Sequence, residues 1–180
     1  MNEIVELPTV QDTRAYGARL ASVLRAGDLV VLSGPLGAGK TALVQGIGLG
    51  LGVSGRVTSP TFVLARVHRG PVPLVHVDAY RLQASASAAL ELDDLDLDAD
   101  LPLSVTVVEW GDGVVEGLSE DRLEIALTRH EDDRRTAVVR GVGPRWAGPG
   151  GPPYRSSTRQ DTSGQGRLDA DRPRAPELPS

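Results

Sequence analysis

The sequence predicts an α/β fold of three layers, with a mainly parallel central sheet and antiparallel additions. Three observations support this class. Leu29–Ser33 is an apolar run of strand type that leads into a glycine-rich loop and then into a helical pattern. Two further apolar runs, 74–78 and 105–109, each end in an acidic residue. The segment 121–142 is typical of a hairpin around the polar turn 130–134.

Two helices are predicted, one before and one after the Leu29–Ser33 strand in the sequence. The first covers 9–28, where Thr9 can cap the helix and an acidic residue lies in the first turn. The second covers 40–52, although Gly46 and Gly48 within it each cost about 1 kcal/mol relative to alanine. The remaining predicted elements are strands within 56–68 and 74–82 around a turn, a weak helix over 84–92, a strand within 103–113, and the hairpin 121–142.

Composition divides the chain near residue 143. The last 38 residues hold seven of the 13 prolines and almost no large aliphatic side chains. Such a segment cannot bury enough apolar area to offset its ordering entropy. We therefore expect one folded domain over residues 1–142 and a disordered tail over 143–180.

Overall composition excludes several classes of protein. There is no cysteine, so disulfides and thiolate metal sites are ruled out. The net charge of −5 argues against a protein that binds nucleic acid through phosphate contacts alone. No apolar run approaches the length of a membrane span, and the N-terminal residues lack the basic start of a signal peptide. We expect a cytoplasmic protein that does not enter a membrane.

The segment 34–41 matches the pattern G-x-x-x-x-G-K-[ST] of a phosphate-binding loop, the P-loop. It contains Lys40, the only lysine among 19 basic residues. A compact ammonium on a slim stem fits under such a loop, whereas a broad guanidinium does not. Thr41 would place a hydroxyl where Mg²⁺ binds. The residues expected to contact the nucleotide here are Gly34, Leu36, Gly37, Ala38, Gly39, Lys40, Thr41 and Ala42.

A P-loop also needs a carboxylate at the end of a neighbouring strand. Asp78 and Glu109 both follow apolar runs, and both are candidates. The acidic cluster 91–100 alternates with leucine and is better explained as a solvated face than as a metal site. His76, two residues before Asp78, is better explained as a histidine of the core or of the site wall.

The base specificity follows from an absence in the sequence. GTPases bind guanine through an Asn-Lys-x-Asp motif, but Asn2 is the only asparagine here and Lys40 lies in the P-loop. ATP is therefore favoured over GTP.

Four stretches taken in order resemble the TsaE family, the small bacterial P-loop ATPases needed to make threonylcarbamoyladenosine in tRNA. They are GPLGAGKTALVQGIGLGLG, VTSPTFVL, PLVHVDAYRL and VVEWGDG. The resemblance covers roughly residues 4–142. It implies an ATPase that works with the TsaD and TsaB proteins and reaches tRNA through their complex.

The resemblance also implies roles for individual residues. Lys40 would bind phosphates, Thr41 and Glu109 would hold Mg²⁺, and Asp78 would orient the attacking water. Ser59, Pro60 and Thr61 would form a switch-like loop over the γ-phosphate. The implied nucleotide neighbours further away are Trp110 and, at the start of the first helix, Val10 and Thr13. The sequence departs from the family at RVHRG after the SPTF motif, where acids are common.

Two other functions remain open from the residues. A small-molecule kinase would use the same P-loop but should carry a lid with several arginines, and only Arg81 stands beside a site motif. A nucleotide sensor would keep the P-loop but would not need Asp78. Phosphate release from ATP without an acceptor distinguishes the ATPase from both.

Overall fold

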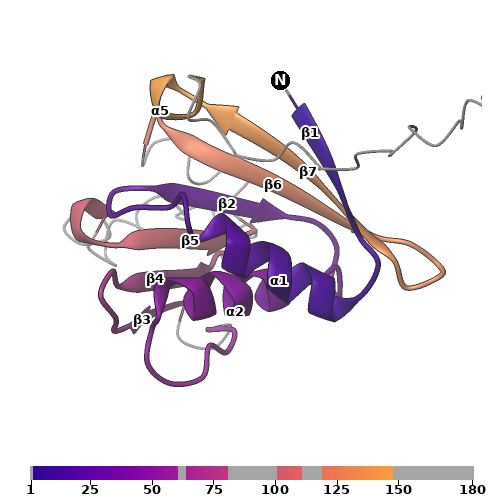
Figure 1. The fold of residues 1–180 in the computed structure, drawn as a ribbon, viewed down its shortest axis with the longest axis horizontal. Helices are drawn as coiled ribbons and strands as arrows, with labels where there is room; N and C mark the ends of the chain where they lie inside the picture. Colours follow the sequence, from indigo (N-terminus) through magenta and orange to yellow (C-terminus); the bar gives the residue numbers. More distant parts are fainter. Residues whose placement is uncertain (1, 61–63, 81–100, 111–118, 148–180) are drawn as a thin grey trace, which may run out of the picture.

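The computed structural model describes residues 2–60, 64–80, 101–110 and 119–147. These residues form one seven-stranded sheet with two long helices against it (Figure 1). The elements are β1 (Asn2–Leu7), α1 (Val10–Leu20), β2 (Leu29–Ser33), α2 (Lys40–Leu51), β3 (Ala65–His68), β4 (Leu74–Asp78), a 3-10 turn (Leu101–Leu103), β5 (Val105–Glu109), β6 (Arg122–Arg129), β7 (Arg135–Val142) and α5 (Pro144–Ala147).

The sheet has a parallel centre and antiparallel edges. Its strand order is β1-β7-β6-β2-β5-β4-β3. Strands β6, β2, β5 and β4 run parallel. At one edge β7 pairs antiparallel with β6 and β1 pairs antiparallel with β7, and at the other edge β3 pairs antiparallel with β4. The predicted α/β class with antiparallel additions is confirmed. The β1 strand was not predicted, and it pairs with the far end of the described chain, as in the pair Leu7 and Arg135.

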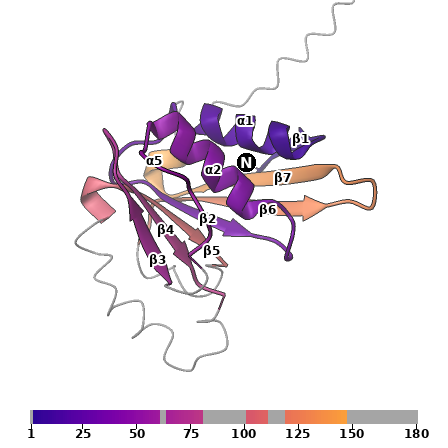
Figure 2. The ribbon, with the colours of Figure 1, turned by 90° about the horizontal axis from the view of Figure 1, so that it is seen from below.

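Helices α1 and α2 lie on the same side of the sheet and pack against each other (Figure 2). The predicted cap of α1 is present, since the Asp12 amide donates to Thr9 Oγ1 and the Thr9 amide donates to Asp12. The helix ends at Leu20, earlier than the predicted 28. The weak helix predicted over 84–92 lies outside the described residues, so a third layer is not seen among them.

Glycines let the two helices approach closely. A Cβ added at Gly46 would lie 2.1 Å from the carbonyl oxygen of Arg14, and one added at Gly17 would lie 2.3 Å from that of Leu43. Each glycine therefore leaves room for the backbone of the other helix. This explains why Gly46 is present in α2, although glycine weakens a helix. The contact fixes α1 relative to the loop that precedes α2.

The core between the helices and the sheet is almost entirely aliphatic. Its largest fully buried members include Leu20, Leu32, Leu43, Ile47 and Leu127. In strands β4 and β5 every residue is buried, as expected for the centre of a parallel sheet. Within the described residues, no helix is long and apolar enough to cross a membrane.

The folded domain extends beyond Val142, so the predicted start of the tail at residue 143 is too early. Residues Pro144–Ala147 form the short helix α5, and its Trp146 is only 4% exposed. Arg145 pairs with the buried Asp28 at 3.1 Å and donates to the carbonyl of Val23. The buried Trp146 ring, the ion pair and hydrogen bonds of Arg145 therefore hold this segment to the domain. The predicted disorder of 148–180 lies outside the described residues.

Candidate phosphate-binding site

The P-loop connects the end of β2 to the start of α2. Gly34, with φ 130°, lies against β6, where a Cβ would come within 2.2 Å of the Leu127 carbonyl oxygen. Gly39, with φ 107°, is the N-cap of α2 and provides no side-chain hydrogen bond. The first amides of α2 are therefore not capped by a side chain, which is the arrangement that receives an anion at a helix N-terminus.

Lys40 is held beneath the loop. Its Nζ donates to the carbonyl oxygens of Gly34 at 2.6 Å and Pro35 at 3.1 Å. It also lies 3.7 Å from the centroid of the Trp110 ring, in cation–π contact. Burial lowers the pKa of Lys40, and the charges of Glu109 and Asp78 partly oppose that effect. The only lysine of the chain is thus buried and oriented by several groups.

Glu109 stands at the end of β5 and meets the start of α2. Thr41 Oγ1 donates to Glu109 Oε1 at 3.0 Å, and His76 Nε2 lies 2.8 Å from the same oxygen. Glu109 is 3% exposed and His76 is fully buried. The predicted Thr41 and Glu109 pair is therefore brought together, and His76 joins it as a wall of the site.

Asp78 ends β4 in direct register with Glu109 on β5. Parallel pairing thus places the two predicted carboxylates at the same edge of the sheet. Asp78 Oδ2 accepts a hydrogen bond from Ser59 Oγ at 3.1 Å, and Oδ1 accepts one from the Tyr80 amide at 3.1 Å. Ser59 therefore connects the predicted switch loop to the strand end, while Thr61 lies outside the described residues.

Trp110 turns the chain at the end of β5. Its φ of 63° is in the left-handed region, and its amide donates to the Leu32 carbonyl at 2.8 Å. Its ring lies 5.1 Å from that of Tyr80 and directly over Lys40. The indole is therefore in contact with Lys40, and its role as a reporter of nucleotide binding stays a prediction.

The start of α1 and the β6–β7 hairpin also lie close to the P-loop. A Cβ at Gly39 would lie 3.6 Å from Thr13 Cγ2 and 3.3 Å from Arg135 Cδ, and one at Gly37 would lie 3.4 Å from Arg129 Nη1. The predicted neighbour Thr13 is thus next to the loop, but its hydroxyl donates to the Thr9 carbonyl.

Other predicted nucleotide contacts differ in exposure. Leu36 is 92% exposed at the loop tip, whereas Ala38 is fully buried. Val10 and Ala42 are half-buried, at the starts of α1 and α2. Sequence reasoning missed Arg129 and Arg135, because only the register of β6 and β7 brings these two arginines of the hairpin to the loop.

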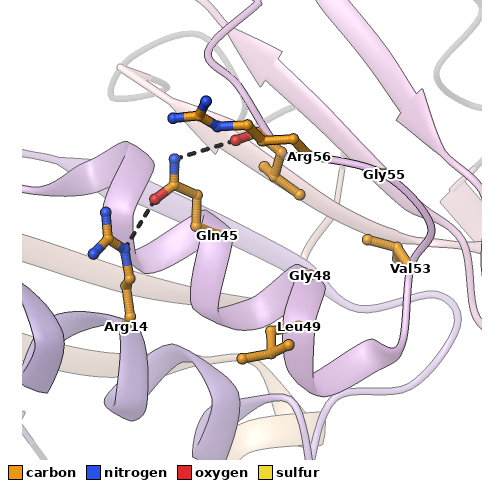
Figure 3. Close-up of a pocket in the computed structure, with 8 residues that line it drawn as sticks. Arg14, Gln45, Gly48, Leu49, Val53, Gly55 and Arg56 are labelled. Atoms are coloured by element: carbon orange, nitrogen blue, oxygen red, sulfur yellow. Dashed lines mark hydrogen bonds between the residues drawn. The ribbon is translucent and has the colours of Figure 1, made fainter.

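A separate groove of about 340 Å³ lies between α1, α2 and the segment that follows α2 (Figure 3). Arg14 Nε donates to Gln45 Oε1 at 3.1 Å, and Gln45 Nε2 donates to the Val57 carbonyl at 3.2 Å. The groove is lined by none of the predicted site residues. Its hydrogen bonds connect both helices to Val57, two residues before the predicted switch loop.

The chain was compared with known proteins. A family model described as "Threonylcarbamoyl adenosine biosynthesis protein TsaE" matches residues 7–137. The Streptomyces coelicolor tRNA threonylcarbamoyladenosine biosynthesis protein TsaE is 58% identical over 142 residues, covering 74% of this chain and 93% of that protein. The protein of the same name from Mycobacterium tuberculosis H37Rv is 56% identical over 136 residues, covering 71% and 81%.

A solved structure is also similar. The crystal structure of YdiB from Bacillus subtilis aligns with a TM-score of 0.66 and 30% sequence identity, covering 81% of this chain and 88% of that one.

Proposed function

The chain belongs to the TsaE family of tRNA threonylcarbamoyladenosine biosynthesis proteins, and we propose that it serves this pathway as a Mg²⁺-dependent ATPase. The observation that carries the proposal is the convergence of three groups on one loop. Lys40 is held beneath the P-loop, and Glu109 bonds to Thr41 at the first turn of α2. Asp78 stands beside Glu109 on the adjacent strand.

The side chains that are present fit a magnesium ion bound together with a nucleotide. Thr41 and Glu109 offer a hydroxyl and a carboxylate, which are oxygen ligands that Mg²⁺ prefers. Within the described residues there is no group of three or more His, Cys, Asp or Glu able to hold a metal ion. This agrees with the usual Mg²⁺ site, where one or two protein ligands act with phosphate oxygens and water. When bound, the ion neutralises charge on the phosphates.

The remaining groups have distinct roles in the proposed reaction. Lys40 and the first amides of α2 bind the phosphates and stabilise the negative charge that develops on them. Asp78 orients the attacking water, and its bond from Ser59 aligns the carboxylate with the switch loop. Trp110 covers the lysine and excludes water from one side of it. Phosphoryl transfer of this type depends on positioning and charge stabilisation more than on covalent chemistry.

The partners follow from membership of the family. We propose that TsaD and TsaB act with this chain in the cytoplasm, and that tRNA is reached through their complex. A missing positive group or an unordered switch can cost about 10³–10⁵ in rate. We therefore expect the isolated chain to bind ATP but hydrolyse it slowly, and the assembled complex to accelerate turnover.

The deciding experiment measures phosphate release from ATP with no acceptor present. The wild-type chain should release phosphate, faster with TsaD and TsaB than alone. Asp78→Asn should bind ATP and Mg²⁺ nearly normally without turning over, and Glu109→Gln should lose hydrolysis by orders of magnitude. Lys40→Ala and Lys40→Arg should both fail to bind ATP, because the guanidinium is too broad for the loop.

Three outcomes would contradict the proposal. Near-normal turnover by Asp78→Asn would remove its assigned role. Equal rates with and without TsaD and TsaB would remove partner stimulation. Phosphate transfer only when a small-molecule acceptor is added would favour the kinase instead.

A further inference from the structure

A buried histidine lies behind the proposed metal ligand. His76 is at the centre of β4, where all five residues are buried, and its own exposed fraction is zero. Its Nε2 lies 2.8 Å from Glu109 Oε1. Its Nδ1 is buried and has no hydrogen-bond partner among the described residues. A carboxylate oxygen accepts hydrogen bonds, so in this contact Nε2 acts as the donor when it carries the ring hydrogen.

Such a residue is costly in the middle of an apolar strand. A buried polar atom without a partner destabilises the fold, because it has lost its hydrogen bonds to water. A valine or leucine at this position would match the neighbouring residues of LVHVD and leave no unpaired nitrogen. The imidazole therefore gains less from burial than an aliphatic side chain would, and its one hydrogen bond within the described residues is the bond to Glu109.

The bond from His76 restricts the orientation of the Glu109 carboxylate. Oε1 accepts from both His76 and Thr41, whereas Oε2 has no hydrogen bond within the described part of the chain. Thr41 lies in the first turn of α2, directly after the glycine-rich loop. His76 lies on β4, a strand that is paired on both sides, with β5 and with β3.

We propose that His76 is a positioning residue, which donates through Nε2 to Glu109 Oε1 and so holds Oε2 free for the magnesium ion. This inference rests on the proposed function, since it concerns the ion bound with ATP. It extends that function to a residue that touches neither the ion nor the nucleotide. Partners of this kind orient metal ligands elsewhere, and their loss typically lowers metal affinity about 10–100-fold.

The test compares two substitutions of His76. His76→Phe keeps a ring of similar size but removes the donor, and His76→Gln keeps an N–H donor. Nucleotide binding is followed by Trp110 fluorescence, first in EDTA and then during titration with Mg²⁺ at a fixed ATP concentration. We expect equal ATP affinity in EDTA for all three proteins. The Phe variant should need about 10–100-fold more Mg²⁺, and the Gln variant should return to within about threefold of wild type.

A second comparison separates positioning from packing. In a Glu109→Gln background, His76→Phe should cause little further loss of Mg²⁺ affinity, because residues that act through one another are not additive. Wild-type Mg²⁺ affinity in the Phe variant, or no recovery in the Gln variant, would overturn the proposal.

A measurement on the wild-type chain keeps the proposal testable if a variant does not fold. Nitrogen-15 NMR of the imidazole should show a hydrogen on Nε2. A neutral ring with its hydrogen on Nδ1 instead would overturn the proposal, because Nε2 would have none to donate. Failure of the wild-type chain to bind ATP would be a different result, which overturns the proposed function itself.

Discussion

The close contact of α1 and α2 makes a sharp prediction for Gly46→Ala. In an isolated helix this change is favourable by about 1 kcal/mol, because alanine is the better helix former. Here the new Cβ would lie 2.1 Å from the carbonyl oxygen of Arg14 and 2.8 Å from its carbonyl carbon. Both obstacles are backbone atoms of α1, so no side chain can rotate away. The helices must separate by about 1 Å to restore an ordinary contact.

The size of the effect follows from two opposing contributions. Overpacking a close contact costs about 1–3 kcal/mol, and a backbone obstacle belongs at the upper end. Subtracting the propensity gain of about 1 kcal/mol leaves a net destabilisation of about 2 kcal/mol. For a domain of this size that corresponds to a fall in Tm of about 6 °C. Moving α1 also moves Thr13 away from Gly39, so ATP affinity should fall as well.

Thermal and urea unfolding of the purified variant measure the change. The matched control is Leu49→Ala on the same helix, where the side chain is 75% exposed and the change should stay within about 0.5 kcal/mol. Gly17→Ala should resemble Gly46→Ala, since its Cβ would lie 2.3 Å from the Leu43 carbonyl oxygen. A Gly46→Ala variant as stable as wild type would show that helix propensity, not helix approach, governs this position.

Three further predictions concern pH and the end of the fold. ATP affinity should decline as pH rises, and the decline should start below pH 10.5, because burial lowers the pKa of Lys40 and only its ammonium form binds phosphate. A plot of log Kd against pH that bends at or above pH 10.5 would contradict this. A chain ending at Val142 should melt several degrees below one ending at Ala147, since it lacks the buried Trp146, and equal Tm values would refute this anchor. Burial, together with His76 and Arg66, lowers the pKa of His68 in the folded chain. Below about pH 6.5 the unfolded chain therefore binds more protons than the folded chain. The free energy of unfolding should then fall as pH drops, by at most about 1.4 kcal/mol per pH unit. His68→Gln should flatten that slope in urea titrations at several pH values, and an unchanged slope would assign it to other groups.

The sequence allowed the P-loop and its neighbouring strands to be predicted because their signals are local. The run before Gly34, the glycine spacing and Lys40 lie within a dozen residues. The carboxylates required one more step, namely that parallel strands end at a common edge of the sheet. That step predicted that Asp78 and Glu109 lie close together, and their direct register shows that they are neighbours.

The features that were missed depend on contacts between distant segments. The short β1 strand is stabilised by pairing with β7, and its own residues give no strong signal. Arg135 reaches Gly39 only because of the hairpin register. The predicted core or wall role of His76 is compatible with its burial, but its partner Glu109 was not identifiable from spacing. Trp146 was assigned to a tail because the prolines around it outweighed one aromatic side chain.

The strand order has a consequence for how the protein forms during synthesis. Strand β1, made first, has no neighbour in the sheet until β7, the last strand among the described residues, has been made. Strand β2, which leads into the P-loop, likewise acquires its β6 neighbour only after residues 122–129 are made. Pairings between such distant segments are slow to form and leave edges open in the meantime. In a nascent chain, the sheet around the P-loop is therefore completed only after the β6–β7 hairpin has been made, and we expect the proposed nucleotide binding to require that hairpin.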